Sequence, residues 1–172
     1  VFHRQPVVTD SAVKRAHMID GQIVTDIDST ISLLQNKNII NPERIGILGH
    51  CMGGRMSLLG ACADRRIQAC VVFYGGNCMV SWGGDDPTPF ERIGDIRCPV
   101  LGLFGNEDEN PSPDDVDRIS AEMTRCGITH EFHRYHDAGH AFQNFLSDKR
   151  YRSKSSADAW NKTLTFLSHR LG

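Results

Sequence analysis

The stretch GILGHCMGGR, residues 46–55, places a cysteine between glycines directly after a short apolar run. Cys51 has Gly49 two residues before it and Gly53 two residues after it. A residue at a sharp strand-to-helix turn takes a positive φ, and glycine at the two flanking positions removes side chains that would clash there. The spacing therefore predicts a nucleophile elbow with Cys51 at its apex.

The predicted elbow would activate the Cys51 sulfur in two ways. The sulfur would lie at a helix N-terminus, where the helix dipole favours the thiolate. The backbone N–H of Met52 would point into the same space and could donate to an oxyanion. This pattern indicates nucleophilic chemistry, whereas the alternative interpretation of Cys51 is a buried thiol in a tight turn.

A nucleophile of this kind needs a base, which in elbow proteins follows it along the chain. His140, in the stretch AGHAF, comes after the last predicted strand and is our candidate. His136 competes but is nearer the strand, and His130 and His133 lie within the strand itself. The position past the strand favours His140.

The third group is an acid, which would hold the tautomer of the histidine ring. Three carboxylates follow the strand that ends at Gly105, namely Glu107, Asp108 and Glu109. Any one of them taken alone could belong to a solvated acidic loop, so the residues by themselves leave the choice open.

The elements that must position these residues alternate between helix and strand. Helices are predicted over residues 22–37, 52–63 and 113–126 and from Ser155 or Ser156 onward, and strands over residues 45–48, 69–76, 100–105 and 129–135. The helix at 113–126 has Ser112 as N-cap, Pro113 in its first turn, Asp115 three residues after the cap and Gly127 at its end. In the last helix, we expect an inner stripe of Trp160, Leu164, Leu167 and Leu171.

This alternation predicts an α/β fold, with a mostly parallel sheet covered by helices on both faces. Ligands of such sheets bind outside the carboxyl ends of the strands. Cys51, the acidic cluster and His140 all follow strands, so they should meet at one edge of the sheet. Residues 75–98 are rich in Gly, Pro and Asp, and we expect them to pass over that edge.

The composition is that of a single globular domain, with 172 residues, 40% of them hydrophobic and 23% charged. A net charge of -2 indicates neither nucleic acid nor an anionic membrane as a partner, and no stretch reads as a membrane span or signal peptide. The six cysteines lack a C-x-x-C pair, so we expect no metal site but free thiols in a reducing, cytoplasmic setting. Because the chain begins with Val1, we expect a fragment, a processed form or an incomplete chain.

Three motifs together, RIGILGHCMGG, GNEDENP and YHDAGHAFQN, resemble the dienelactone hydrolase family of α/β-hydrolases. The resemblance spans roughly residues 22–169 and implies a Cys-Asp-His triad. It assigns Cys51 as the nucleophile, Asp108 as the acid and His140 as the base. It also implies that residues 1–172 form one α/β-hydrolase domain, equivalent to the C-terminal two-thirds of the usual fold.

The chain departs from the family pattern in two places. Family members begin with several more strands and a helix, which have no counterpart here and which normally supply the second oxyanion donor. Enzymes that act on dienelactone itself carry an arginine where this chain has Asn144, which cannot pair with a substrate carboxylate. The resemblance therefore implies the family more firmly than the substrate after which it is named.

We expect a hydrolase that cleaves a small ester or lactone through a thioester acyl-enzyme, without a metal or organic cofactor. Tyr74 and Trp82 are expected to shape the acyl pocket, although Trp82 could instead be a hydrophobic plug for its loop. One alternative is a truncated, non-catalytic hydrolase fold used for binding or assembly. Others are a redox-active thiol protein and a peptidase. The sequence carries no signal for the oligomeric state.

Overall fold

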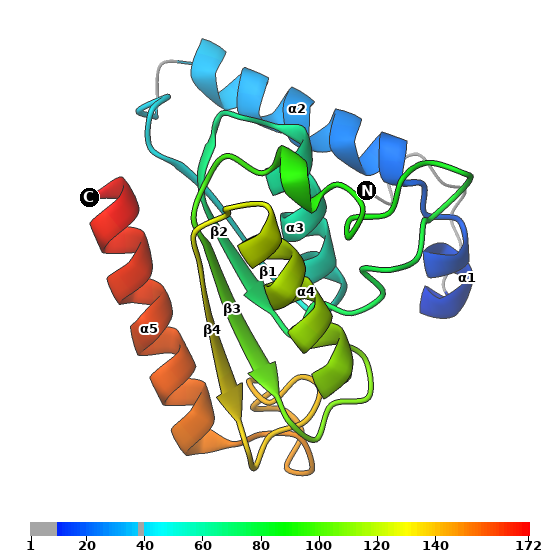
Figure 1. Cartoon of the computed structure of the whole chain (residues 1–172), viewed down its shortest axis with the longest axis vertical. Coiled ribbons are helices and arrows are strands. Elements are labelled where there is room, and N and C mark those ends of the chain that lie inside the picture. Colours follow the sequence, from blue (N-terminus) through cyan, green and yellow to red (C-terminus); the bar gives the residue numbers. More distant parts are fainter. Residues whose placement is uncertain (1–9, 38–39) are drawn as a thin grey trace.

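Residues 10–37 and 40–172 are described by the computed structural model, and Val1 lies outside them. Their centre is a four-stranded sheet in the order β1-β2-β3-β4, in which every neighbouring pair is parallel (Figure 1). The strands are β1 (Ile45–His50), β2 (Ile67–Phe73), β3 (Val100–Gly105) and β4 (His130–Tyr135). The predicted parallel α/β fold is thus confirmed.

The register of the sheet brings the carboxyl ends of the strands to one level. His50 is paired with Phe73, Phe73 with Leu103, and Leu103 with His133. Strand β2 ends at Phe73, three residues earlier than predicted, because Tyr74 takes a φ of 39° and leaves the extended conformation. Residues that follow the four strands consequently emerge side by side at one edge.

Helices cover both faces of the sheet because alternate side chains of each strand point to opposite sides. In β2, Cys70 and Val72 contribute to one hydrophobic cluster and Val71 and Phe73 to another. The first cluster receives α3 (Met52–Ala63) and α4 (Pro113–Arg125), whereas the second receives α5 (Ser153–Leu171). Helix α2 (Asp20–Asn36) lies over α3, and α1 (Ser11–Ala16) precedes it (Figure 1).

The predicted start of α4 is confirmed in detail. The Ser112 side chain accepts from the backbone N–H of Asp115, and the Asp115 carboxylate accepts from the N–H of Ser112. Pro113 occupies the first turn, and Gly127 follows the helix with a φ of 70°. These local signals fix the two ends of the helix that follows β3, and its N-cap fixes where the loop with Glu107, Asp108 and Glu109 ends.

The predicted inner stripe of α5 is wrong in part. Trp160 and Leu164 are 44% and 51% exposed, whereas Ser155, Ala159 and Thr163 are buried. Small side chains let the helix approach the sheet closely, and the Thr163 hydroxyl remains satisfied because it donates to the carbonyl of Ala159. The predicted cap is also wrong, since the N-cap residue is Arg152 rather than Ser155 or Ser156.

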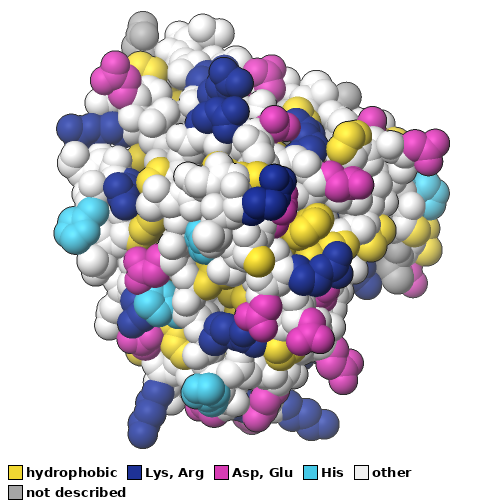
Figure 2. All heavy atoms as spheres, viewed as in Figure 1, with side chains coloured by type: hydrophobic (Ala, Val, Ile, Leu, Met, Phe, Trp, Pro, Cys, Tyr) yellow, Lys and Arg dark blue, Asp and Glu magenta, His cyan; other side chains and the backbone are white. Residues whose placement is uncertain are grey.

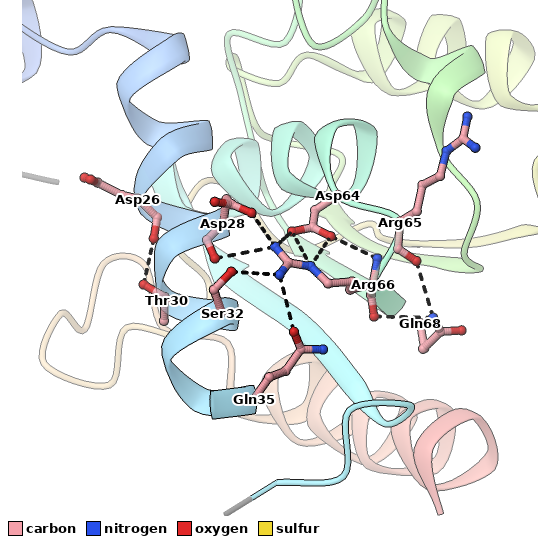
Figure 3. A network of polar contacts seen from close by, with 9 residues as sticks. All are labelled: Asp26, Asp28, Thr30, Ser32, Gln35, Asp64, Arg65, Arg66 and Gln68. Atoms are coloured by element: carbon pink, nitrogen blue, oxygen red, sulfur yellow. Dashed lines mark hydrogen bonds and ion pairs between the residues drawn. The ribbon is translucent and has the colours of Figure 1, made fainter. Parts of the chain in front are cut away.

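Arg66 fastens α2 to the turn between α3 and β2. Its guanidinium donates to both carboxylate oxygens of Asp64, and it reaches across to α2, where Nη2 binds Oδ1 of Asp28 at 2.6 Å (Figure 3). Nη1 adds a 2.9 Å hydrogen bond to the Ser32 hydroxyl. The bonds to Arg66 lower the pKa of Asp64, so the carboxylate of this network is held in its charged form. We name Arg66, Asp64, Asp28 and Ser32 the Arg66 network.

The surface mixes charges of both signs. On the face seen in Figure 2, Lys and Arg side chains are interspersed with Asp and Glu, and hydrophobic side chains form small separate groups. No helix within residues 10–37 and 40–172 has the length and apolar character to cross a membrane. All six cysteines are free thiols, and four of them are buried.

Candidate active site

The turn after β1 adopts the predicted strained geometry. Cys51 has a φ of 56°, a conformation that non-glycine residues rarely take. A Cβ added at Gly49 would lie 2.1 Å from the carbonyl oxygen of Gly53, so the turn excludes any side chain at Gly49. Helix α3 begins at the next residue, which places the Cys51 side chain at the helix N-terminus and exposes it.

The second glycine requirement falls on a different residue from the one predicted. A Cβ at Gly53 would meet no described atom within 4 Å, whereas a Cβ at Gly54 would lie 2.7 Å from the carbonyl oxygen of Phe73. Gly54 faces the end of β2, and the absence of a side chain lets the helix lie against it. The elbow pattern alone does not distinguish Gly53 from Gly54, because the close approach at Gly54 is to the end of the neighbouring strand.

The Cys51 sulfur and the His140 ring are in direct contact. Nε2 of His140 lies 2.9 Å from Sγ of Cys51, although the two residues are 89 positions apart. The ring comes from the loop after β4, and the thiol from the loop after β1. These loops meet because they leave the same edge of the sheet.

Among the three candidate acids, Asp108 is the one that contacts the histidine. Its Oδ2 lies 2.9 Å from Nδ1 of His140, and its Oδ1 accepts from the backbone N–H of Asn110. Asp108 is 5% exposed, while Glu107 and Glu109 are exposed. Burial thus distinguishes Asp108 from the other two candidate acids, Glu107 and Glu109.

The loop that carries His140 is fastened to the acidic loop. The backbone N–H of Glu107 donates to the carbonyl of Ala138, and a Cβ at Gly105 would lie 2.1 Å from that same oxygen. Arg152 donates from Nε to the carbonyl of Asp137, three residues before His140. The base and the acid are therefore held by backbone contacts as well as by their own hydrogen bond.

The other histidines of β4 and its exit lie elsewhere. Nδ1 of His136 accepts from the side-chain amide of Asn106 at 2.9 Å. His130 contacts the hydroxyl of Ser120, and His133 contacts Glu131. Each has a partner away from the Cys51 sulfur.

The hydrogen bonds of this site shift the pKa values of Cys51 and His140 in opposite directions. The hydrogen bond from His140 lowers the pKa of Cys51, and the backbone N–H of Met52 lowers it further. The hydrogen bond to Asp108 and then that to Cys51 raise the pKa of His140 to about 10. Both shifts favour the charged forms, a thiolate beside an imidazolium.

Of the residues expected to contact substrate, Tyr74 lies beside the triad candidates and Trp82 does not contact them. The Tyr74 ring meets the His140 ring edge-on, with centroids 5.4 Å apart. Trp82 stacks on the guanidinium of Arg55 at 3.7 Å and packs against the cluster of Met18, Ile23 and Leu59. This environment favours the plug interpretation of Trp82.

Two further features of the site region escaped the sequence analysis. Nε2 of His50 lies 2.7 Å from Oε1 of Gln143, so the residue before Cys51 is bonded to the loop of His140. Arg55 is fully buried one helical turn after Cys51. A signal for Arg55 was present, because it is the one charged residue in the otherwise apolar and small sequence of α3.

Comparisons with known proteins agree with this fold. The family model described as "Dienelactone hydrolase family" matches residues 4–171. A protein of Methylorubrum extorquens named "Putative carboxymethylenebutenolidase" is 31% identical over 145 residues, which are 83% of this chain and 49% of that protein. A Bradyrhizobium protein named "Probable 2-oxo-3-(5-oxofuran-2-ylidene)propanoate lactonase" is 30% identical over 149 residues, covering 86% of this chain and 59% of the relative.

A comparison with solved structures also finds this fold. The crystal structure titled "Putative Dienelactone Hydrolase" from Klebsiella pneumoniae has a TM-score of 0.84 at 25% identity, and the match covers 94% of this chain and 68% of that one. This chain spans about half the length of the curated relatives that it matches.

The glycine contacts predict an ordering of three substitutions. Gly49→Ala and Gly54→Ala force a Cβ into backbone atoms, so each should lower the free energy of unfolding by more than about 3 kcal/mol or prevent folding. Gly53→Ala places a methyl group in open space within a helix and should stay within about 1 kcal/mol of the original chain. Urea unfolding measures all three, and a Gly53→Ala variant as unstable as Gly54→Ala would contradict this description.

The lowered pKa of Cys51 predicts selective alkylation. Iodoacetamide at pH 7 should modify Cys51 first, because burial raises the pKa of Cys62 and Cys78 to about 12 and the pKa of the half-exposed Cys126 is raised as well. Peptide mapping by mass spectrometry at successive times measures the order. His140→Ala should slow the reaction of Cys51 about tenfold or more, and the control is the rate at Cys126, which should not change.

Proposed function

Because the chain belongs to the dienelactone hydrolase family, we propose that it hydrolyses a small ester or lactone through Cys51, His140 and Asp108. The proposal is carried by the continuous line of contacts from Sγ of Cys51 through the His140 ring to the Asp108 carboxylate, each 2.9 Å long. Relatives named for carboxymethylenebutenolidase and lactonase activities support an ester or lactone as the substrate class. The free thiols are typical of a reducing, cytoplasmic setting.

The first half of the proposed reaction forms a thioester. The Cys51 thiolate attacks the carbonyl carbon, and the electron pair of the C=O bond moves to oxygen. The backbone N–H of Met52, which already donates to the sulfur, stabilises the developing oxyanion. When the tetrahedral intermediate collapses, the bond to the leaving oxygen breaks and Nε2 of the His140 imidazolium gives that oxygen its proton.

The second half uses the same ring as a base. Neutral His140 takes a proton from water, and the resulting hydroxide attacks the thioester carbonyl. Collapse of this intermediate expels the Cys51 thiolate and releases the acid, so the resting thiolate and imidazolium are restored. Asp108 keeps Nδ1 of the ring protonated and oriented in both halves.

Tyr74 is proposed as the substrate contact nearest the reacting atoms. Its ring lies between His140 and Phe142, at centroid distances of 5.4 Å and 5.2 Å, and the residue is 3% exposed. Burial and then the charge of Cys51 raise the pKa of its hydroxyl, so the phenol remains a hydrogen-bond donor at neutral pH. Its φ of 39° is a strained conformation of the kind that functional sites retain.

Turnover of a chromogenic short-chain ester tests the proposal. Cys51→Ala and His140→Ala should each lower kcat at least about a thousandfold, since the groups act as a unit. Cys126→Ala is the matched control, because that thiol lies at the end of α4 and touches no group of the site. A folded protein whose turnover is zero, or equal in Cys51→Ala, would contradict the proposal and favour a binding role.

The raised pKa of His140 predicts the alkaline limit of activity. Acylation needs the imidazolium, so kcat/KM should fall as the pH rises through about 10, where His140 loses its proton. Asp108→Asn removes the largest contribution that raises this pKa and should move the falling limb to lower pH. Rates from pH 6 to 11, corrected for spontaneous hydrolysis, measure the limb, and an unmoved limb in Asp108→Asn would refute the assigned role of the acid.

A further inference from the structure

Arg55 is a fully buried cation that the proposed reaction does not use. It has an exposed fraction of 0% and lies on the first turn of α3, where its backbone N–H donates to the carbonyl of Cys51. Its guanidinium forms a bidentate ion pair with Asp20, with Nη1–Oδ1 at 2.6 Å and Nη2–Oδ2 at 2.9 Å. Burial of such a pair is costly unless further hydrogen bonds complete it.

The remaining contacts of Arg55 all go to the loop that follows β2. Nε donates to the carbonyl of Asn77 at 3.0 Å, and Nη2 donates to the carbonyl of Val80 at 2.6 Å. The Trp82 ring covers the guanidinium plane, and the Trp82 backbone N–H donates to Oδ2 of Asp20. The flat fork of an arginine can make these contacts together, whereas a lysine ammonium cannot.

From this loop a short path leads to the candidate acid. The backbone N–H of Asn77 donates to Oδ1 of Asn110 at 2.8 Å, and the N–H of Asn110 donates to Oδ1 of Asp108 at 2.9 Å. The two loops are in tight contact, because a Cβ at Gly76 would lie 2.3 Å from Oδ1 of Asn110. A displacement of Asn77 would therefore move Asn110 and, with it, one of the bonds that hold Asp108.

We propose that Arg55 is a positioning residue that acts through Asn77 and Asn110 to hold Asp108 against His140. The effect of Arg55 on catalysis rests on the proposed function. Its effect on the ionisation of Cys51 and His140 does not, and can be measured without turnover. Cys51 is the N-cap of helix α3, and Arg55 lies on the first turn of the same helix. The same turn thus presents the nucleophile and anchors the loops that orient the acid.

The Arg66 network provides a matched control (Figure 3). Arg66 also bridges two carboxylates, Asp28 of α2 and Asp64 at the end of α3, and so contributes to packing of the same two helices. The Arg66 side chain bonds to Asp28, Ser32 and Gln35 of α2 and to Asp64 in the turn before β2, away from the acidic loop. Arg55→Lys and Arg66→Lys make the same chemical change, but only the first lies on the path to Asp108.

The rate of Cys51 alkylation by iodoacetamide, measured from pH 5 to 10, tests the proposal without requiring turnover. Arg55→Lys should raise the midpoint of the profile by about one pH unit and so lower the rate at pH 6 about tenfold, because a loosened Asp108 holds less charge on His140. Arg66→Lys should leave the midpoint unchanged even if it lowers the melting temperature. An unchanged midpoint in a folded Arg55→Lys variant would overturn the proposal.

Asn110→Ala tests the path itself and remains informative if Arg55→Lys does not fold. It removes the acceptor of the Asn77 N–H and should shift the midpoint in the same direction as Arg55→Lys. If both act on one path, the double variant should shift no further than the larger single shift. Fully additive shifts, or no shift in Asn110→Ala, would overturn the route. If the ester assay fails while these shifts appear, the proposed function is wrong and the positioning role stands.

Discussion

The contact between the sulfur of Cys51 and the ring of His140 is the constraint that organises this molecule. It joins loops that follow the first and the last strand of the sheet, and those strands are not neighbours. It can form only because all four strands run in the same direction and end at the same level. The parallel sheet therefore positions the two loops whose side chains make this 2.9 Å contact.

Glycine and burial then determine how precisely the contact is made. Gly49 and Gly54 let the first turn of α3 lie against the ends of β1 and β2, and Gly105 lets the histidine loop lie against the acidic loop. Asp108 is buried, so its carboxylate has few partners besides His140 and the Asn110 N–H. These backbone approaches, rather than long side chains, bring the three groups into register.

The sequence was sufficient for the fold and for the chain order of the candidate groups. Strong local signals, such as the apolar run before Cys51 and the capping box at Ser112, depend on neighbouring residues and so can be read from the sequence alone. The need for glycine at position 54 and the burial of Thr163 depend on a strand and a sheet face far away in the chain. The role of Arg55 likewise depends on Asp20 and on a loop that has no regular structure to predict.

The distance along the chain between the thiol and the imidazole has a consequence for folding. A contact that spans 89 positions closes a large loop, and its entropy can be offset only after the intervening strands have paired. Isolated α3 with its preceding strand would carry the cysteine but no partner to ionise it. During refolding, the lowered pKa of Cys51 would therefore appear only in chains whose sheet is complete.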